Sequence, residues 1–157
     1  VLADTARAVT CYEQALTLPA SDQWRPADSD RVRLHRSAAR TLIAAGRMAE
    51  AEQHLQAAMA IVADAGEASP DNANLLYDVA LWRWHNNEYT QAFAVAQHSL
   101  DIADRLQDNQ AIAQAYEMLA LACHSLGEWQ QGLDFEQQRA TLVGSRLDVT
   151  EAFDAHL

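Results

Sequence analysis

Apolar residues along the chain recur at spacings of three and four, and short polar breaks separate the runs. The clearest case is residues 73–106, where two amphipathic runs flank a polar break at residues 85–88. The first run is apolar around most of its circumference, which favours a helix that is covered on more than one side. The second run has a single apolar stripe, which is typical of a half-exposed helix. Together the two runs predict a helical hairpin.

The hairpin pattern repeats at a period of about forty residues. Small residues open the predicted second helices at intervals of 43, 41 and 40 residues: Ala8, Ala51, Ala92 and Gly132. Upstream of three of them lies a turn in which glycine or asparagine precedes a large apolar residue by two places: Gly46/Met48, Asn87/Tyr89 and Gly127/Trp129. Glycine and asparagine accept the left-handed backbone conformation that ends a helix. A fixed period of this size predicts a solenoid of stacked hairpins.

In this register the chain resembles a tetratricopeptide-repeat array. The small residues of that family's consensus are matched in three successive repeats by Ala39/Ala51/Ala58, by Ala80/Ala92/Ser99 and by Ala120/Gly132. The resemblance implies an all-α fold, an antiparallel helix-hairpin solenoid that forms a right-handed superhelix of about eight helices. The period is forty rather than thirty-four residues, as in the long-repeat arrays of kinesin light chains and of bacterial multidomain signalling ATPases and transcriptional regulators. The third repeat departs from the pattern, since Glu136 and Arg139 stand where apolar and small residues are expected.

The register also sets the expected boundaries. We expect a half repeat over residues 1–20, a loop over 19–30, and full repeats over 31–66, 71–107 and 108–145. The helices expected within them span residues 5–18, 31–45, 48–65, 72–85, 89–106, 108–125 and 129–143. A capping box at Asp148–Glu151 predicts the start of a further repeat within 148–157. We therefore expect a single domain, residues 1–157, that is a fragment of a longer array.

Charge is distributed unevenly along the chain. There is no lysine, and 11 arginines face 22 acidic residues, for a net charge of −11. Residues 1–47 hold seven arginines and five acids, a net charge of +2, and the remainder holds four and seventeen, a net charge of −13. The acidity argues against direct nucleic-acid binding, and no apolar run approaches the length of a membrane span. Cys11 and Cys123 lie in helical runs, so we expect packed, reduced thiols and a cytoplasmic location.

Signatures of catalysis are missing from the sequence. Without lysine, neither a phosphate-loop ATP site nor a Schiff base can form within these residues, and no G-x-S-x-G, H-E-x-x-H or C-x-x-C motif occurs. His85 and His124 lie one repeat apart and could face the same groove, but no third ligand accompanies them. We expect a polar surface role for these histidines, no metal, no cofactor and no enzymatic activity.

One predicted helix carries a ladder of arginines. Arg33, Arg36 and Arg40 are spaced three and four apart, so they share one face. The resemblance implies that this face lines a concave groove, together with matching positions on the next two first helices: Asn74, Tyr77, Leu81, Trp84, His85, Gln114, Glu117, Leu121 and His124. Such a groove would hold a peptide by its carboxylates and apolar side chains. The alternative is that the arginines pair with Asp28, Asp30 or neighbouring acids and that the aromatic residues pack between helices.

The resemblance implies a non-catalytic scaffold that binds a peptide or protein segment, and the arginine ladder and the aromatic positions favour a segment of acidic or aromatic character. It places that scaffold as the sensor or interaction region of a larger bacterial signalling or transcription-regulatory protein. A structural alternative also remains open. In that alternative the repeats self-associate, or dock on an attached ATPase, cyclase or DNA-binding domain and regulate it. A third interpretation keeps the groove but gives it a small effector as ligand.

Overall fold

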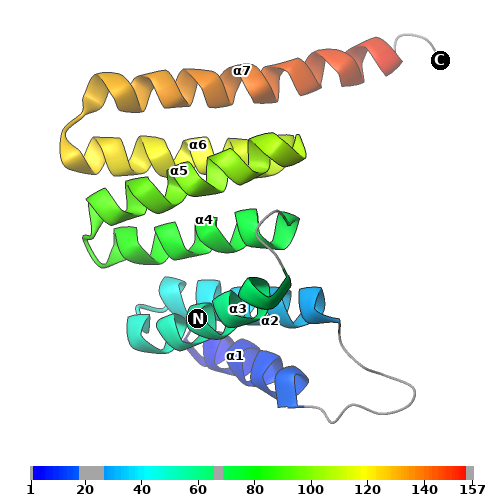
Figure 1. The fold of residues 1–157 in the computed structure, drawn as a ribbon, viewed down its shortest axis with the longest axis vertical. Helices are drawn as coiled ribbons and strands as arrows, with labels where there is room; N and C mark the ends of the chain where they lie inside the picture. The colour runs from blue at the N-terminus through cyan, green and yellow to red at the C-terminus, as the bar shows by residue number, and fades with distance from the viewer. Residues whose placement is uncertain (1, 18–26, 66–68, 155–157) are drawn as a thin grey trace.

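A computed structural model describes residues 2–17, 27–65 and 69–154, with side chains described over 4–17, 27–63 and 69–144. Within these residues the chain consists of helices and the short turns between them. The seven helices (Figure 1) are α1 Leu2–Thr17, α2 Asp28–Ala44, α3 Met48–Ala65, α4 Pro70–His85, α5 Tyr89–Leu106, α6 Asn109–Leu126 and α7 Trp129–Asp154. The predicted all-α hairpin solenoid is confirmed. Much of the loop predicted at residues 19–30 lies outside the described residues, and α2 begins inside that range, at Asp28.

Three hairpin turns have the same geometry, and the sequence explains why. Gly46, Asn87 and Gly127 adopt φ values of 74°, 63° and 82°, the left-handed conformation that was predicted from their residue types. In each turn the next residue's N–H bonds back over a distance of 2.9 Å to a carbonyl five residues earlier. These bonds satisfy carbonyl groups that the end of a helix would otherwise leave unpaired. The three turns join α2 to α3, α4 to α5, and α6 to α7.

Small residues form the contact line within each hairpin. Ala39 and Ala51 are fully buried, as are Ala80 and Ala92, and in the third pair Ala120 is fully buried and Gly132 is buried. Because these side chains extend no further than Cβ, the two helix backbones approach closely. Larger apolar side chains then fill the layers between hairpins. One cluster joins α1 to α4, and two further clusters join α4 to α7.

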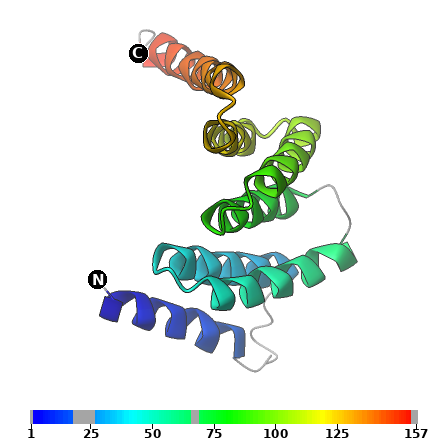
Figure 2. The same cartoon turned by 90° about the vertical axis from the view of Figure 1, so that its left-hand side faces the viewer.

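The helices stack in chain order along the long axis, and successive hairpins are rotated relative to one another (Figure 2). The first helices form their own contacts, because α2 packs on α4 and α4 packs on α6. The main chains of α3 and α5, and of α5 and α7, do not approach one another within the described part of the chain. The stack therefore curves, with α2, α4 and α6 on the inner, concave side and the second helices spread apart on the outer side.

The structure differs from the sequence predictions at two places. The α7 helix continues unbroken through residue 148 to Asp154, so no new helix begins at the predicted capping box. Cys11 is exposed rather than packed, because it lies nearly opposite the buried Val9 around the α1 helix, whereas Cys123 is fully buried.

Candidate functional site

The concave face is marked by a buried carboxylate that bridges two repeats. Asp78, on α4, is fully buried, and its Oδ2 accepts a 2.6 Å hydrogen bond from Nε of Arg36 on α2. The Arg36 side chain is 14% exposed, so this ion pair lies largely out of water. Burial raises the pKa of the Asp78 carboxyl, while Arg36 and then Arg40 act in the opposite direction. The pair fixes α2 against α4 with a charge-assisted bond that joins residues 42 positions apart.

The two arginines give this centre a net positive charge. Nε of Arg40 lies 3.7 Å from the other Asp78 oxygen, Oδ1, which makes no hydrogen bond. Half of the Arg40 side chain is exposed, and its guanidinium carbon lies 6.0 Å from the centre of the Tyr77 ring. One carboxylate therefore faces two guanidinium groups. Arg40 is the one that reaches solvent on the concave face.

Arg33, the third member of the predicted ladder, points away from this centre. It pairs with Asp30 on its own helix, and nearby Arg31 pairs with Asp28 at 3.2 Å. The structure thus divides the ladder, with Arg36 bound to a buried partner, Arg33 bound locally and Arg40 half exposed. Asp78 was missed by sequence reasoning. Its signal was an acidic residue in the middle of a helix that is apolar on most of its sides.

The predicted groove residues of α4 are partly used in packing. Tyr77 is buried, and Leu81 is partly buried in the clusters on both sides of α4. Trp84 donates from Nε1 to Oγ of Ser125 on α6 at 2.8 Å, and the His85 ring meets Trp84 edge-on with centres 5.0 Å apart. These residues line the seam between α4 and α6.

At the ends of this surface the predicted residues have separate roles. Asn74 donates to the carbonyl oxygen of Pro70 at 2.8 Å. Gln114, Glu117 and Leu121 are partly buried on α6. Burial, and then the nearby Glu117, raise the pKa of the Tyr77 hydroxyl. His124 turns to α7, where its ring stacks on Trp129 at 5.5 Å. A Cβ at Gly132 would lie 2.5 Å from that ring, so glycine makes room for His124 there.

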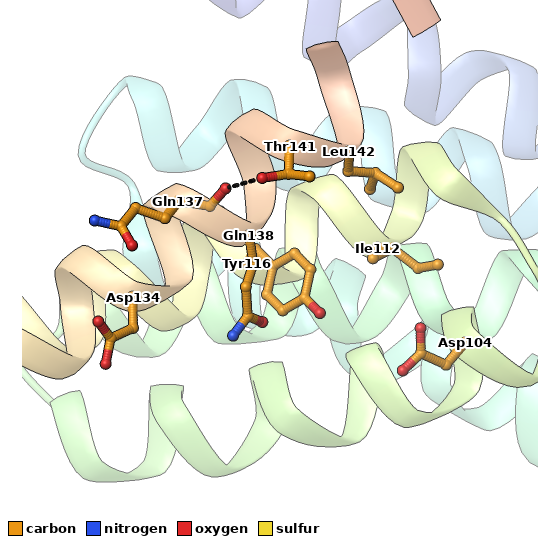
Figure 3. Close-up of a pocket in the computed structure, with 8 residues that line it drawn as sticks. All are labelled: Asp104, Ile112, Tyr116, Asp134, Gln137, Gln138, Thr141 and Leu142. Carbon is orange, nitrogen blue, oxygen red and sulfur yellow. Dashed lines mark hydrogen bonds between the residues drawn. The ribbon is translucent and has the colours of Figure 1, made fainter. Parts of the chain in front are cut away.

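A second hollow lies on the outer side of the stack, where α5 and α7 spread apart over α6. Its volume is about 790 Å³, and its lining combines carboxylates, amides and an apolar floor (Figure 3): Asp104, Ile112, Tyr116, Asp134, Gln137, Gln138, Thr141 and Leu142. Burial, and then the nearby Asp104, raise the pKa of the Tyr116 hydroxyl. This hollow could not be predicted from the sequence, because three helices contribute to its lining and each contributes residues of ordinary type.

The middle of the chain is similar to a known family of helical repeats. Residues 30–105, which span α2 to α5 almost completely, match the model of the tetratricopeptide repeat. Over these residues the chain matches tetratricopeptide repeats. Repeats of this family generally mediate protein–protein interaction and are typically non-catalytic, which supports a scaffold role for the array. No curated protein sequence matches the chain.

Two further findings concern the described residues alone. None of their helices is both long and apolar enough to cross a membrane. No group of three or more histidine, cysteine, aspartate or glutamate side chains is placed there to hold a metal ion.

Proposed function

We propose that the array binds an acidic segment of a peptide or protein along the concave face formed by α2, α4 and α6. The observation that carries this proposal is the unequal charge at the α2–α4 junction, where Arg36 and Arg40 face the single carboxylate of Asp78. The exposed half of Arg40 is available to a carboxylate of the ligand. A carboxylate–guanidinium hydrogen bond is stronger than a neutral one, so Arg40 would act as the anchor.

The surroundings of Arg40 favour a segment that also carries apolar side chains. Leu81, Trp84 and Leu121 lie along the same face, each partly exposed. Aromatic and aliphatic groups of this kind contribute contact area to peptide recognition. The face is positive only near Arg40, because Glu117 stands at the α6 end. We therefore propose that the acidic part of the ligand lies over α2 and the apolar part over α4 and α6.

A labelled peptide of alternating glutamate and leucine tests this proposal by fluorescence anisotropy. The variant Arg40→Gln should weaken binding about tenfold or more, because a lost hydrogen bond to a charged group costs about 1.5–3 kcal/mol. Arg105→Gln is the matched control, since it makes the same charge change at an exposed site on the second helix α5. Equal weakening by both variants would show that only net charge matters, and would contradict the proposed anchor.

We also propose that the array is the interaction region of a larger cytoplasmic bacterial protein in signalling or transcription regulation. The support for this is the forty-residue period, which resembles the long-repeat arrays of such proteins. The two cysteines of the chain are both free, which fits a reducing compartment.

Self-association is the second candidate function, and exposed apolar residues of α7 favour it. Trp129, Leu133 and Val143 are exposed by 67%, 49% and 47%. The matching face of α5 includes Phe93 and Leu100 and packs on α6. An apolar helix face at this position of the repeat is therefore able to pack against another helix. The occupant proposed here is α7 of a second copy, related by a two-fold axis. Sedimentation over a range of protein concentrations separates this candidate from the first, since only self-association makes the apparent mass rise with concentration.

A further inference from the structure

Two histidines face each other across the first hairpin, away from the concave centre. His35 is on α2 and His54 is on α3, and their Nδ1 atoms lie 3.1 Å apart. The ring centres are 5.3 Å apart and the ring planes are inclined at 51°. Both side chains are partly buried, and that of His54 is 14% exposed. Neither histidine takes part in the proposed peptide surface.

This separation suits two ligands of one metal ion. Histidine nitrogens bind zinc at about 2.0–2.1 Å, so in a tetrahedral site two of them lie about 3.4 Å apart. At the right angles of a square-planar or octahedral site the same bond lengths place them about 2.9 Å apart. The observed 3.1 Å lies between these two values. In the metal-free protein the same distance fits a hydrogen bond in which one Nδ1 donates its proton to the other.

Two features of the surroundings favour metal binding by these rings. Burial, then His54 and Arg31, lower the pKa of His35, so that its imidazole is neutral at neutral pH. The charge of Arg31 is offset by its pairing with Asp28 at 3.2 Å. On the far side of the His54 ring, Nε2 lies 4.0 Å from Oε1 of Glu13 on α1. A carboxylate there favours a proton on Nε2, which leaves the Nδ1 lone pair of His54 for a metal.

We propose that His35 and His54 together chelate one divalent transition-metal ion through their Nδ1 atoms, with Glu13 as a positioning residue. Binding requires the Nδ1 proton of the metal-free hydrogen bond to move to Nε2 of the same ring by exchange with water, so that both rings stay neutral and both Nδ1 lone pairs face the ion. No third histidine, cysteine, aspartate or glutamate among the described residues joins the pair, so water fills the other coordination positions. Imidazole ligands favour copper, nickel and zinc over magnesium and calcium. A bound ion would link α2 to α3 and stabilise the N-terminal half of the array.

Thermal unfolding of the tag-free, chelator-treated protein tests this site. Zinc, nickel and copper should each raise the Tm of the natural chain reversibly, with removal by chelator, and magnesium should not, because only ligands that bind the folded state preferentially stabilise it. His35→Gln and His54→Gln should each abolish the shift relative to their own metal-free Tm. His98→Gln is the matched control, because His98 is an exposed histidine on α5. Reference to each variant's own metal-free Tm keeps the comparison valid if a substitution alters stability.

A copper titration followed by electron paramagnetic resonance gives a second readout. We expect one ion per chain and a signal from two coordinated nitrogens, lost in His35→Gln. Glu13→Gln should weaken binding about tenfold, as for other residues that orient a metal-bound histidine. Unchanged affinity in that variant would overturn the positioning role of Glu13. Absence of binding by the natural chain, or binding that survives in both histidine variants, would show that the pair is only a hydrogen bond.

Discussion

The two junctions between first helices use the same positions in opposite ways. At the α2–α4 junction the contact is ionic, with Arg36 and Arg40 on α2 facing Asp78 on α4. Moving forward by one repeat converts these three positions to Tyr77, Leu81 and Met118. At the α4–α6 junction these residues pack in one apolar cluster, with Met118 fully buried. Both junctions bring two first helices into contact, but the side chains between the helices are ionic at one junction and apolar at the other.

The difference indicates that the ionic junction is not needed for stacking. An apolar cluster stabilises a repeat junction without any desolvation of charge, whereas a buried ion pair offsets its attraction by the cost of removing both ions from water. At the α2–α4 junction this cost is not fully offset, because the buried Oδ1 atom of Asp78 accepts no hydrogen bond. We infer that the charges at the α2–α4 junction serve ligand binding and the fixed placement of α2, and that the apolar junction serves cohesion.

The largest effect is expected when the ionic junction loses only its acid. Asp78→Met leaves Arg36 buried without a partner and should lower the free energy of unfolding by about 3–5 kcal/mol. The measurement is the midpoint of urea unfolding. Asp101→Met is the control, since Asp101 is exposed on α5 and its loss should change stability by less than about 0.5 kcal/mol. Equal, small effects in both variants would mean that Arg36 reaches water easily and that the pair does not hold the junction.

A smaller effect is expected when the whole junction is exchanged. The triple variant Arg36→Tyr, Arg40→Leu and Asp78→Met copies the α4–α6 junction into the α2–α4 junction. Its free energy of unfolding should match that of the natural chain or exceed it by about 1–4 kcal/mol, as when other buried ion pairs are replaced by apolar residues. It should also lose binding of the acidic peptide while its helix content stays unchanged. A triple variant as unstable as Asp78→Met alone would show that the spacing of α2 and α4 does not accommodate the apolar side chains of the α4–α6 junction.

Sequence periodicity was enough to predict the features that depend only on residues within a single repeat. The left-handed turns at Gly46, Asn87 and Gly127 follow from residue type, and the small residues inside each hairpin follow from the spacing. These features depend on contacts within about one repeat. The helical hairpins could therefore be read from the sequence without knowledge of their neighbours.

Features that join separate helices could not be read in the same way. The Arg36–Asp78 pair and the His35–His54 pair each depend on the rotation of one helix about its axis relative to another. Periodicity fixes which residues share a face, but a small rotation of one helix about its axis changes which of them contact the neighbouring helix. His124 shows the consequence, since its spacing suggested the groove and its ring instead stacks on Trp129 of α7. The exposure of Cys11 has the same cause.

The smallest expected effect is a pH dependence that only the ionic junction has. Burial raises the pKa of Asp78 above its ordinary value of about 3.9, against the opposing influence of Arg36 and Arg40, the charged groups that face it from α2. The folded state therefore binds the proton more tightly than the unfolded chain does. By linkage, the contribution of this group to stability is fully present below the unfolded pKa and is lost as pH rises through the folded pKa.

The comparison of the natural chain with the triple variant isolates this contribution, because the other titrating groups are common to both. As pH falls from 8 towards 4, the natural chain should gain stability relative to the triple variant, and the midpoints of urea unfolding at several pH values measure the gain. The direction of the change decides between two physical accounts of the junction. A natural chain that instead loses relative stability on acidification would show that attraction to Arg36 and Arg40 outweighs burial. The pKa of Asp78 would then lie below its ordinary value, and the ionic junction would contribute to cohesion as the apolar junction does.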